Sequence, residues 1–295
     1  MTRLLLLGAG GQVGREIAGR ANEAGHDLVA LDHAGLDISD AAALARALAT
    51  ARPDVVINAA AYTAVDRAES EPERAHLINA VAPGLIADAC AAQGAALIHL
   101  STDYVFDGTK QGAYVESDPV APLGVYGASK EAGERAVREG LARHLIIRTS
   151  WVYGVHGGNF LKTMLRLGAE RDRLTIVADQ RGCPTATVDI AQGLLAAAVP
   201  LAAGTLAPGT YHLAGTGATN WCAFAAAILE RAGLHTGRHP EIVPIATVDY
   251  PTPARRPANS ELSSEAFAQA SGYRPAPWQD RVAEVVDQLL ASPAS

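Results

Sequence analysis

Short apolar runs recur along the first half of the chain, each followed by glycine or by polar residues. The first five occupy residues 4–7, 28–31, 55–57, 96–100 and 145–147, and of these only 96–100 is interrupted by a polar residue, His99. Runs that are apolar at every position are typical of parallel strands buried on both faces. Segments with helical patterning separate them, near residues 12–24, 41–51, 71–93 and 125–141. This alternation predicts a doubly wound, Rossmann-type α/β fold with a parallel sheet.

The pattern loosens after Trp151, where helices and short strands follow each other irregularly. We expect helices near residues 159–170, from 187, near 221–232, near 262 and over 278–290, and strands at 175–177 and 211–213. In the first half, Pro83 is expected to break or restart the helix over residues 71–93. The pattern predicts a first lobe of residues 1–150 and a smaller mixed α/β lobe of residues 151–295, with a soft boundary that chain segments can cross. Such a lobe suits the carboxyl edge of the sheet, where open α/β sheets bind ligands.

Composition limits the classes of partner. A net charge of -7 supplies no broad surface for neutralising phosphates, so we predict no nucleic-acid partner. The three cysteines, Cys90, Cys183 and Cys222, are far apart and form no CxxC pair, which favours a reducing compartment over disulfides or a zinc site. Glycines and prolines interrupt the uncharged stretch between Asp189 and Glu230, which argues against a membrane span. We therefore predict a cytoplasmic protein without a membrane partner.

A glycine turn follows the first predicted strand and opens the first predicted helix. Gly8, Gly11 and Gly14 give the spacing GxxGxxG, which lets the backbone approach a pyrophosphate at a helix N-terminus. Asp32 ends the second predicted strand, eighteen residues beyond Gly14, where a carboxylate binds the hydroxyls of an adenosine ribose. A carboxylate favours NADH because it repels a 2′-phosphate, whereas the neighbouring His33 offers a partial offset. The choice between NADH and NADPH therefore stays open.

A phenol and an ammonium stand four residues apart in Tyr126 and Lys130, at the start of a predicted helix. Positions i and i+4 share a helix face, where the ammonium is expected to lower the pKa of the phenol; an exposed surface pair has the same spacing. Thr102 closes the fourth predicted strand at the edge that faces the ligand crevice. Together with a nicotinamide site, the three side chains predict hydride transfer to or from a carbon that bears oxygen.

Four further blocks narrow the prediction: residues 58–66, 101–106, 148–153 and 250–257. With the glycine turn and the Tyr126 and Lys130 pair, they resemble the dTDP-4-dehydrorhamnose reductase family of the extended short-chain dehydrogenase/reductase superfamily. The resemblance runs from Leu4 to about Trp278. It implies reduction of the C4 ketone of dTDP-4-dehydro-L-rhamnose by NADPH or NADH, which gives dTDP-L-rhamnose, a nucleotide sugar for cell-surface polysaccharide.

The resemblance also implies roles for single residues. Tyr126 donates the proton to the C4 oxygen, Lys130 lowers the pKa of Tyr126 and holds the nicotinamide ribose, and Thr102 tunes their hydrogen bonds. Family positions that contact the cofactor match Gly11, Gln12, Val13, Asp32, Asp37, Ile38, Ala61, Tyr62 and Thr63. Those that contact the sugar nucleotide match Thr102, Asp103 and Trp151. We add Arg255 and Arg256 as candidates for the diphosphate, because guanidinium groups pair with phosphate in a bidentate manner.

Metal dependence, assembly and stereochemistry form a last group of expectations. Some members of the family dimerise around Mg²⁺ held by glutamates; Glu16 matches one such position, but Val188 replaces another. We therefore predict no metal site and prefer a monomer, with a homodimer left open.

Two alternatives remain: a nucleotide-sugar 4-ketoreductase that delivers hydride to the other face, and a non-catalytic regulatory subunit similar to that of methionine adenosyltransferase. A regulatory subunit need not keep Thr102, Tyr126 and Lys130 together.

Overall fold

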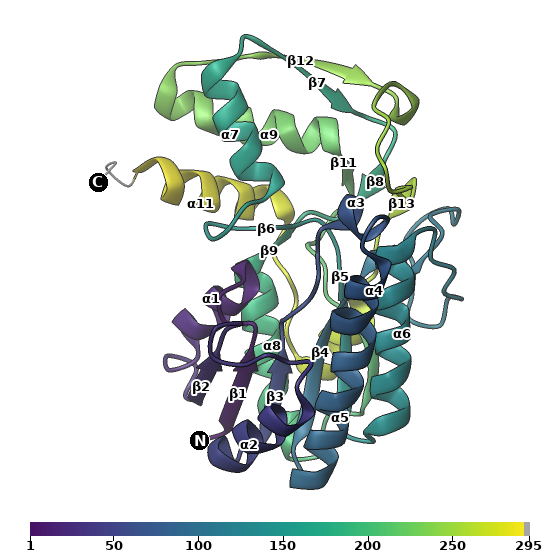
Figure 1. Cartoon of the computed structure of the whole chain (residues 1–295). Helices are drawn as coiled ribbons and strands as arrows, with labels where there is room; N and C mark the ends of the chain where they lie inside the picture. The colour runs from purple at the N-terminus through teal and green to yellow at the C-terminus, as the bar shows by residue number, and fades with distance from the viewer. Residues whose placement is uncertain (292–295) are drawn as a thin grey trace.

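A six-stranded parallel sheet forms the lower lobe of the molecule (Figure 1). The computed structural model describes residues 1–291. Across the sheet the strands run in the order β2-β1-β3-β4-β5-β10. Their bounds are β1 (Arg3–Leu7), β2 (Asp27–Leu31), β3 (Val55–Asn58), β4 (Ala96–Thr102), β5 (His144–Thr149) and β10 (Gly209–His212). The parallel pairing confirms the predicted fold class.

The side chains of β1 show why its apolar run has no polar alternation. Leu4 and Leu6 pack into one hydrophobic core and Leu5 and Leu7 into a second, because successive side chains of a strand point to opposite faces. The first core is completed by α1 (Gln12–Arg20), α8 (Thr187–Ala202) and α10 (Glu265–Ser271). The second is completed by α2 (Ala41–Ala51), α5 (Ala82–Gln93) and α6 (Val125–Gly140). Helices therefore cover both faces of the sheet.

The order of the strands reverses at β1, which pairs with β2 on one side and β3 on the other. At such a switch point the two connections leave the sheet on opposite faces, and a crevice opens at the carboxyl ends of the strands. The glycine turn follows β1, and the loop with residues 61–63 follows β3. Both loops that were predicted to hold a cofactor therefore lie beside this crevice.

The helical stretch before β4 changes its winding near Pro83. It consists of α4 (Pro72–His76), a π-helical turn at Leu77–Val81, and α5, which begins one residue before Pro83. The predicted restart is thus a π turn rather than a break. Residues 72–93 are long and apolar enough to cross a membrane by length and composition alone, and 44% of the most apolar window is buried. Ile86, Ala87 and Cys90 from this stretch belong to the second core of the sheet.

The sixth strand comes from the second half of the chain. β10 pairs with β5 in the large sheet, whereas the strand predicted at residues 211–213 was assigned to the second lobe, residues 151–295. α8 and α10 return to the lower lobe with it, and α8 packs against α1. The division at residue 150 stays a prediction, and residues 292–295 of the predicted second lobe lie outside the described residues.

The upper lobe has its own core, built by three helices and a two-stranded parallel sheet (Figure 1). The helices are α7 (Phe160–Glu170), α9 (Trp221–Thr236) and α11 (Trp278–Ala291), and the strands are β7 (Arg173–Val177) and β12 (Glu241–Ile245). Short strands join the lobes: β6 (Val152–Tyr153) with β9 (Thr185–Ala186), and β8 (Arg181–Gly182) with β11 (Thr219–Asn220) and β13 (Asn259–Ser260). The short helix α3 (Val65–Ala68) precedes α4.

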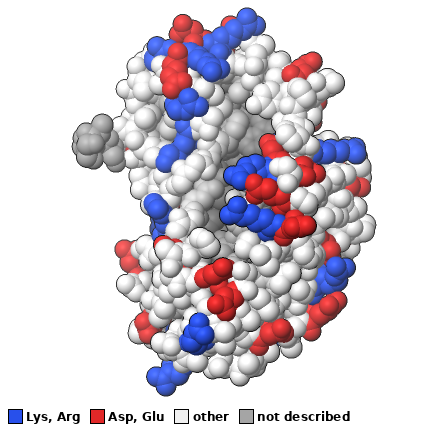
Figure 2. Space-filling model, viewed as in Figure 1, with Lys and Arg blue, Asp and Glu red and all other residues white. Residues whose placement is uncertain are grey.

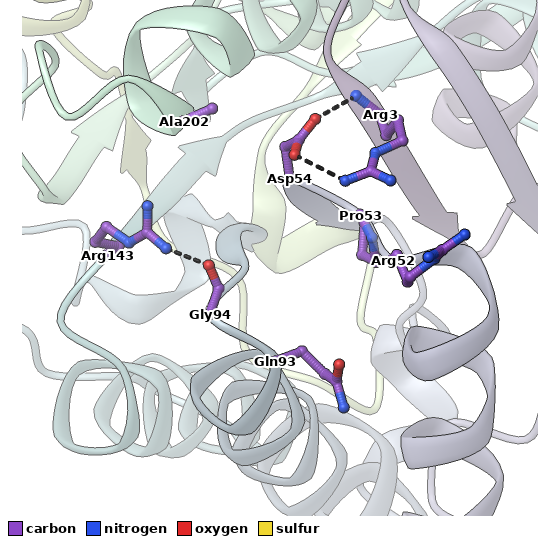
Figure 3. A pocket seen from close by; sticks show the side chains of 8 residues that line it. All are labelled: Arg3, Arg52, Pro53, Asp54, Gln93, Gly94, Arg143 and Ala202. Carbon is purple, nitrogen blue, oxygen red and sulfur yellow. Dashed lines mark hydrogen bonds and ion pairs between the residues drawn. The ribbon is translucent and has the colours of Figure 1, made fainter.

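A pocket of about 360 Å³ lies at the opposite end of the sheet (Figure 3). Three of its lining residues, Arg3, Asp54 and Arg143, open or directly precede β1, β3 and β5, and Gly94 lies two residues before β4. Two of its arginines already have partners: Arg3 pairs with Asp54, and Arg143 donates to the carbonyl of Gly94 (Figure 3). Because the predicted site residues follow the carboxyl ends of the strands, this pocket is no part of the candidate site.

Candidate active site

A cavity of about 850 Å³ lies between the lobes, and the surface is visibly hollowed there (Figure 2). Its walls include Met164 of α7, Trp221 of α9 and Tyr104, which follows β4. Tyr104 meets the ring of Tyr126 edge to face, with ring centroids 5.4 Å apart. The predicted catalytic phenol therefore adjoins the wall of this cavity.

The glycine turn is close-packed, which explains two of its three glycines. Gly8 has φ +83°, and a Cβ at this position would come within 2.5 Å of the amide nitrogen of Ala60. A Cβ on Gly14 would come within 2.2 Å of the carbonyl oxygen of Gly8. Gly11 is the N-cap of α1, and no side chain caps this helix end. The first amide groups of α1, from Gln12 onward, are therefore available to a phosphate.

The loop after β3 is fixed by a side chain that the sequence reading missed. The backbone amide of Tyr62 donates to Oδ1 of Asn79 (2.8 Å), and Nδ2 of Asn79 donates to the carbonyl of Tyr62 (2.9 Å) and to Oγ of Ser129 (3.0 Å). Asn79 is fully buried in the π-helical turn. The loop of Ala61, Tyr62 and Thr63 is thereby tied to the helix that carries Tyr126. No local sequence pattern predicts this turn, although π turns, once seen, are frequent at functional sites.

The structure places the Thr102 hydroxyl beside Tyr126 and the Lys130 ammonium against the end of the same strand, but the expected direction of the phenol's pKa is wrong. Burial raises the pKa of Tyr126 to about 12, the nearby Thr102 hydroxyl lowers it, and Asp103 raises it. Nζ of Lys130 donates to the carbonyl oxygen of Leu100 at 2.7 Å, and burial lowers the pKa of Lys130 to about 8. Desolvation thus outweighs the spacing effect. A neutral phenol is nevertheless the form that can donate a proton.

Asp103 is a buried carboxyl group directly beside Thr102. Its side chain is 2% exposed, Oδ1 accepts a hydrogen bond from Oγ1 of Thr102 (3.0 Å), and Oδ2 has no hydrogen-bond partner. Burial raises the pKa of Asp103 to about 6, against the lowering effect of the Ser260 and Thr102 hydroxyls. A carboxyl with a free buried oxygen at the edge of a ligand crevice is typical of a functional group.

A buried ion pair between Glu134 and Arg148 links α6, the helix that carries Tyr126, to strand β5. Glu134 is fully buried and accepts from Nε and Nη2 of Arg148, at 2.9 and 2.7 Å, and from Oγ of Ser101, at 2.6 Å. Glu134 lies one helical turn after Lys130 and raises the pKa of that lysine. The sequence reading overlooked this group, because a glutamate in a charged helix is usually solvated; its place on the face of Lys130 was the available signal.

Trp151 lies where the chain enters the upper lobe. Its φ is +48°, one of two positive values among the described residues that are not glycine. The indole stacks on Trp221 with ring centroids 3.6 Å apart, and a Cβ on Gly182 would come within 2.4 Å of it. Nε1 of Trp221 donates to the Gln180 side chain. Left-handed backbone strains a tryptophan, so the surrounding contacts must hold it in this position.

The two candidate arginines, Arg255 and Arg256, lie in different environments. Arg256 lines the cavity between the lobes and pairs with Asp66, its Nη2 lying 3.0 Å from Oδ2. Arg255 is exposed and is not among the residues that line this cavity. The geometry therefore favours Arg256 over Arg255 as a ligand group.

The remaining predicted cofactor residues follow β2. Oδ1 of Asp32 accepts from the amides of Ala34 and Gly35, and Oδ1 of Asp37 accepts from Ser39. Ile38 is buried in the second core of the sheet, so its side chain is a packing group. These three positions remain predictions for cofactor contact.

Glu16, the candidate metal position, already has two protein partners. It accepts from Nε of Arg20 at 2.7 Å and from Oγ1 of Thr187 at 3.2 Å. Across residues 1–291, no group of three or more His, Cys, Asp or Glu side chains has the arrangement of a metal site. The position therefore has the character of a helix-to-helix contact between α1 and α8.

The sheet is doubly wound and opens on a glycine turn, and a partly buried phenol lies at its carboxyl edge with a buried ammonium and a buried hydroxyl. These features define the class: a nicotinamide-dependent oxidoreductase of the extended short-chain type. The family described as RmlD substrate binding domain matches residues 1–291. The chain belongs to the dTDP-4-dehydrorhamnose reductase family.

Individual relatives match over nearly the whole chain. A dTDP-4-dehydrorhamnose reductase of Burkholderia thailandensis is 46% identical over an alignment 297 positions long, which covers 98% of this chain and 99% of the relative. The crystal structure of a Clostridium acetobutylicum dTDP-4-dehydrorhamnose reductase is 36% identical with a TM-score of 0.90, over 97% of this chain and 99% of that one. A Bacillus anthracis dTDP-4-dehydrorhamnose reductase, solved in complex with NADP, is 35% identical with a TM-score of 0.89 and the same coverage.

Proposed function

We propose that the protein reduces dTDP-4-dehydro-L-rhamnose to dTDP-L-rhamnose, with NADPH or NADH as reductant. One observation carries this proposal: in a member of the dTDP-4-dehydrorhamnose reductase family, a neutral, partly buried Tyr126 adjoins Thr102 beside the cavity between the lobes. A proton donor at that place suits the reduction of a ketone, in which the oxygen gains a proton as the carbon gains a hydride.

The residues present fit a dinucleotide. The uncapped end of α1 offers amide groups to a pyrophosphate, and the close packing at Gly8 and Gly14 brings the backbone of the turn near to it. Asp32 directly follows β2, where a ribose is bound in this fold. When bound, the reduced nicotinamide supplies the hydride to C4 of the sugar.

The side chains of the chain supply the remaining chemistry. The Tyr126 hydroxyl donates its proton to the C4 oxygen, so the ketone becomes an alcohol and the phenolate recovers a proton from solvent. The Lys130 ammonium, which lies on the same helix face, lowers the energy of the phenolate as it forms. The Thr102 hydroxyl has a single hydrogen, which it donates to Oδ1 of Asp103 in the free protein. When the sugar is bound, that hydrogen bond turns to the C4 oxygen. Asp103, Trp151 and Arg256 bind the sugar nucleotide in the cavity.

Compartment and assembly belong to the same proposal. The protein works as a monomer in the cytoplasm, where the three cysteines stay reduced. Light scattering coupled to size-exclusion chromatography, with Mg²⁺ and with EDTA, tests the monomer. A dimer that dissociates in EDTA would refute it and would return Glu16 to the metal ligands.

The activity assay uses purified protein, dTDP-4-dehydro-L-rhamnose and each reduced cofactor. Absorbance of the nicotinamide gives the rate, and proton NMR of the product gives its stereochemistry. We expect oxidation of the cofactor and dTDP-L-rhamnose as the product. A talose-type product selects the ketoreductase of opposite stereochemistry. Cofactor binding without oxidation refutes the reductase and favours the regulatory subunit.

A further inference from the structure

A second cavity, of about 390 Å³, lies at the carboxyl end of β2. Gly10 of the glycine turn, Leu31 of β2 and Gly35 contribute to its wall, together with Arg15 and Asp32. In this fold the adenosine ribose of a dinucleotide is bound where β2 ends, beside the glycine turn. The groups in this wall therefore meet the 2′ position of the ribose, at which NADH carries a hydroxyl and NADPH a phosphate.

Asp32 is only half available to such a ligand. Its Oδ1 accepts from the amide of Ala34 at 3.1 Å and from the amide of Gly35 at 3.0 Å. Two amide dipoles that point at the carboxylate offset part of its negative charge. Oδ2 remains for a ribose hydroxyl, so the carboxylate repels a 2′-phosphate less than an unbonded aspartate does.

Arg15 brings an opposite charge into the same cavity. It stands in the first turn of α1, and its Nε donates to the carbonyl of Gly10 at 3.1 Å, which directs the guanidinium along the glycine turn. Within residues 1–291, no hydrogen bond or ion pair involves its two terminal nitrogens. Arg20, one helical turn further on, is by contrast paired with Glu16. A guanidinium with two free nitrogens matches the geometry of a phosphate.

We propose that Arg15 is the residue that determines acceptance of NADPH, by binding the 2′-phosphate of the adenosine ribose. Asp32, through Oδ2, binds the hydroxyls of the unphosphorylated ribose, so one cavity serves both cofactors. His33, which the sequence suggested for this purpose, is exposed and is not among the residues that line the cavity. The inference rests on the proposed function only in taking a nicotinamide dinucleotide as the reductant.

The test compares two small ligands that differ only in the 2′-phosphate: adenosine 2′,5′-bisphosphate and 5′-AMP. Calorimetry on the full chain measures both affinities without a nicotinamide and without the sugar. In Arg15→Ala we expect affinity for the bisphosphate to fall about 10- to 100-fold, as for the loss of a charge-assisted contact, and affinity for 5′-AMP to change less than about threefold. Arg15→Lys, which keeps the charge, should recover part of the loss.

Arg20→Ala is the matched control, since it removes an arginine from the same helix that has a protein partner. It should leave the ratio of the two affinities unchanged. In turnover, the ratio of kcat/KM for NADPH to that for NADH should fall in Arg15→Ala by the factor seen in binding. An unchanged affinity ratio in a folded Arg15→Ala protein would overturn the inference, as would a wild-type protein that binds both ligands equally. Ligand binding that follows Arg15 without turnover of the sugar would refute the proposed function alone.

Discussion

Replacement of Asp103 by asparagine should stabilise the protein at neutral pH. The carboxyl group is buried, its Oδ2 has no partner, and burial raises its pKa from 3.8 to about 6. A site chosen only for stability would not keep a charge there, since a buried carboxylate with an unpaired oxygen is destabilising. An asparagine side chain cannot ionise, so Asp103→Asn removes this destabilisation and preserves the size of the side chain.

The sign and size follow from proton linkage. Near pH 4 and below, Asp103 is largely protonated in the folded protein and its buried form is neutral. Between about pH 4 and 6 the unfolded chain ionises while the folded protein still holds the proton, so the folded state loses stability as pH rises. A rise in pKa from 3.8 to about 6 corresponds to about 3 kcal/mol. Wild type and Asp103→Asn should therefore differ little near pH 4 and by up to about 3 kcal/mol at pH 7.5.

Urea unfolding followed by circular dichroism, at several pH values from 4.5 to 7.5, measures this difference. Asp179→Asn is the control of opposite sign: Asp179 accepts from the amide and hydroxyl of Thr247, and these hydrogen bonds lower its pKa. That variant should be less stable than wild type by a similar amount throughout this range, because the stability that a lowered pKa confers is lost only as pH falls below 3.8. The reasoning fails if Asp103→Asn is less stable at pH 7.5, or if its advantage does not vary with pH.

Three further predictions concern the support of the site. Tyr126→Phe should bind cofactor normally and lose turnover by a factor on the order of 100 or more; near-normal turnover in the reductase assay would assign the proton to another group. Glu134→Ala leaves the buried Arg148 without its partner and should cost about 3–5 kcal/mol by urea unfolding, whereas Glu131→Ala on the same helix should cost under about 1 kcal/mol; equal losses would contradict a buried pair. Gly14→Ala forces a Cβ to within 2.2 Å of a carbonyl and should abolish nucleotide binding, and a normal Kd by calorimetry would refute the close approach.

Local patterns made the fold predictable, and distant pairings limited the prediction. In the first half of the chain, an apolar run predicts each strand, and the order of strands and helices then restricts the topology. β10 has the sequence Gly-Thr-Tyr-His and no apolar run, and its partner β5 lies more than fifty residues earlier, so no local pattern indicates that pairing. The same holds for β12, which becomes a strand by pairing with β7.

The candidate site likewise contains residues that the sequence alone identifies and residues that only the folded structure identifies. Gly8, Tyr126 and Lys130 are visible in the sequence because their chemistry depends on spacing within one loop or one helix. The partners of Asn79 and Arg148 come from other elements, so their roles appear only when the chain is folded. The pKa of Tyr126 shows the limit most directly, because spacing predicts a lower value and burial, which spacing does not encode, raises it.

Unfavourable features gather at one edge of the sheet. At the carboxyl edge, Asp103 keeps an unpaired buried oxygen, Trp151 holds a left-handed backbone, and Lys130 is 2% exposed with its pKa lowered by burial. At the amino edge, by contrast, Arg3 and Arg143 lie at the surface and have ordinary partners. Each feature at the carboxyl edge lowers the stability of the folded protein. A neutral residue in place of Asp103 or Lys130, or a glycine in place of Trp151, would restore that stability. Their concentration around Tyr126 is what selection for chemistry produces, because a site that must bind and move charge cannot also be the most stable arrangement of its own side chains.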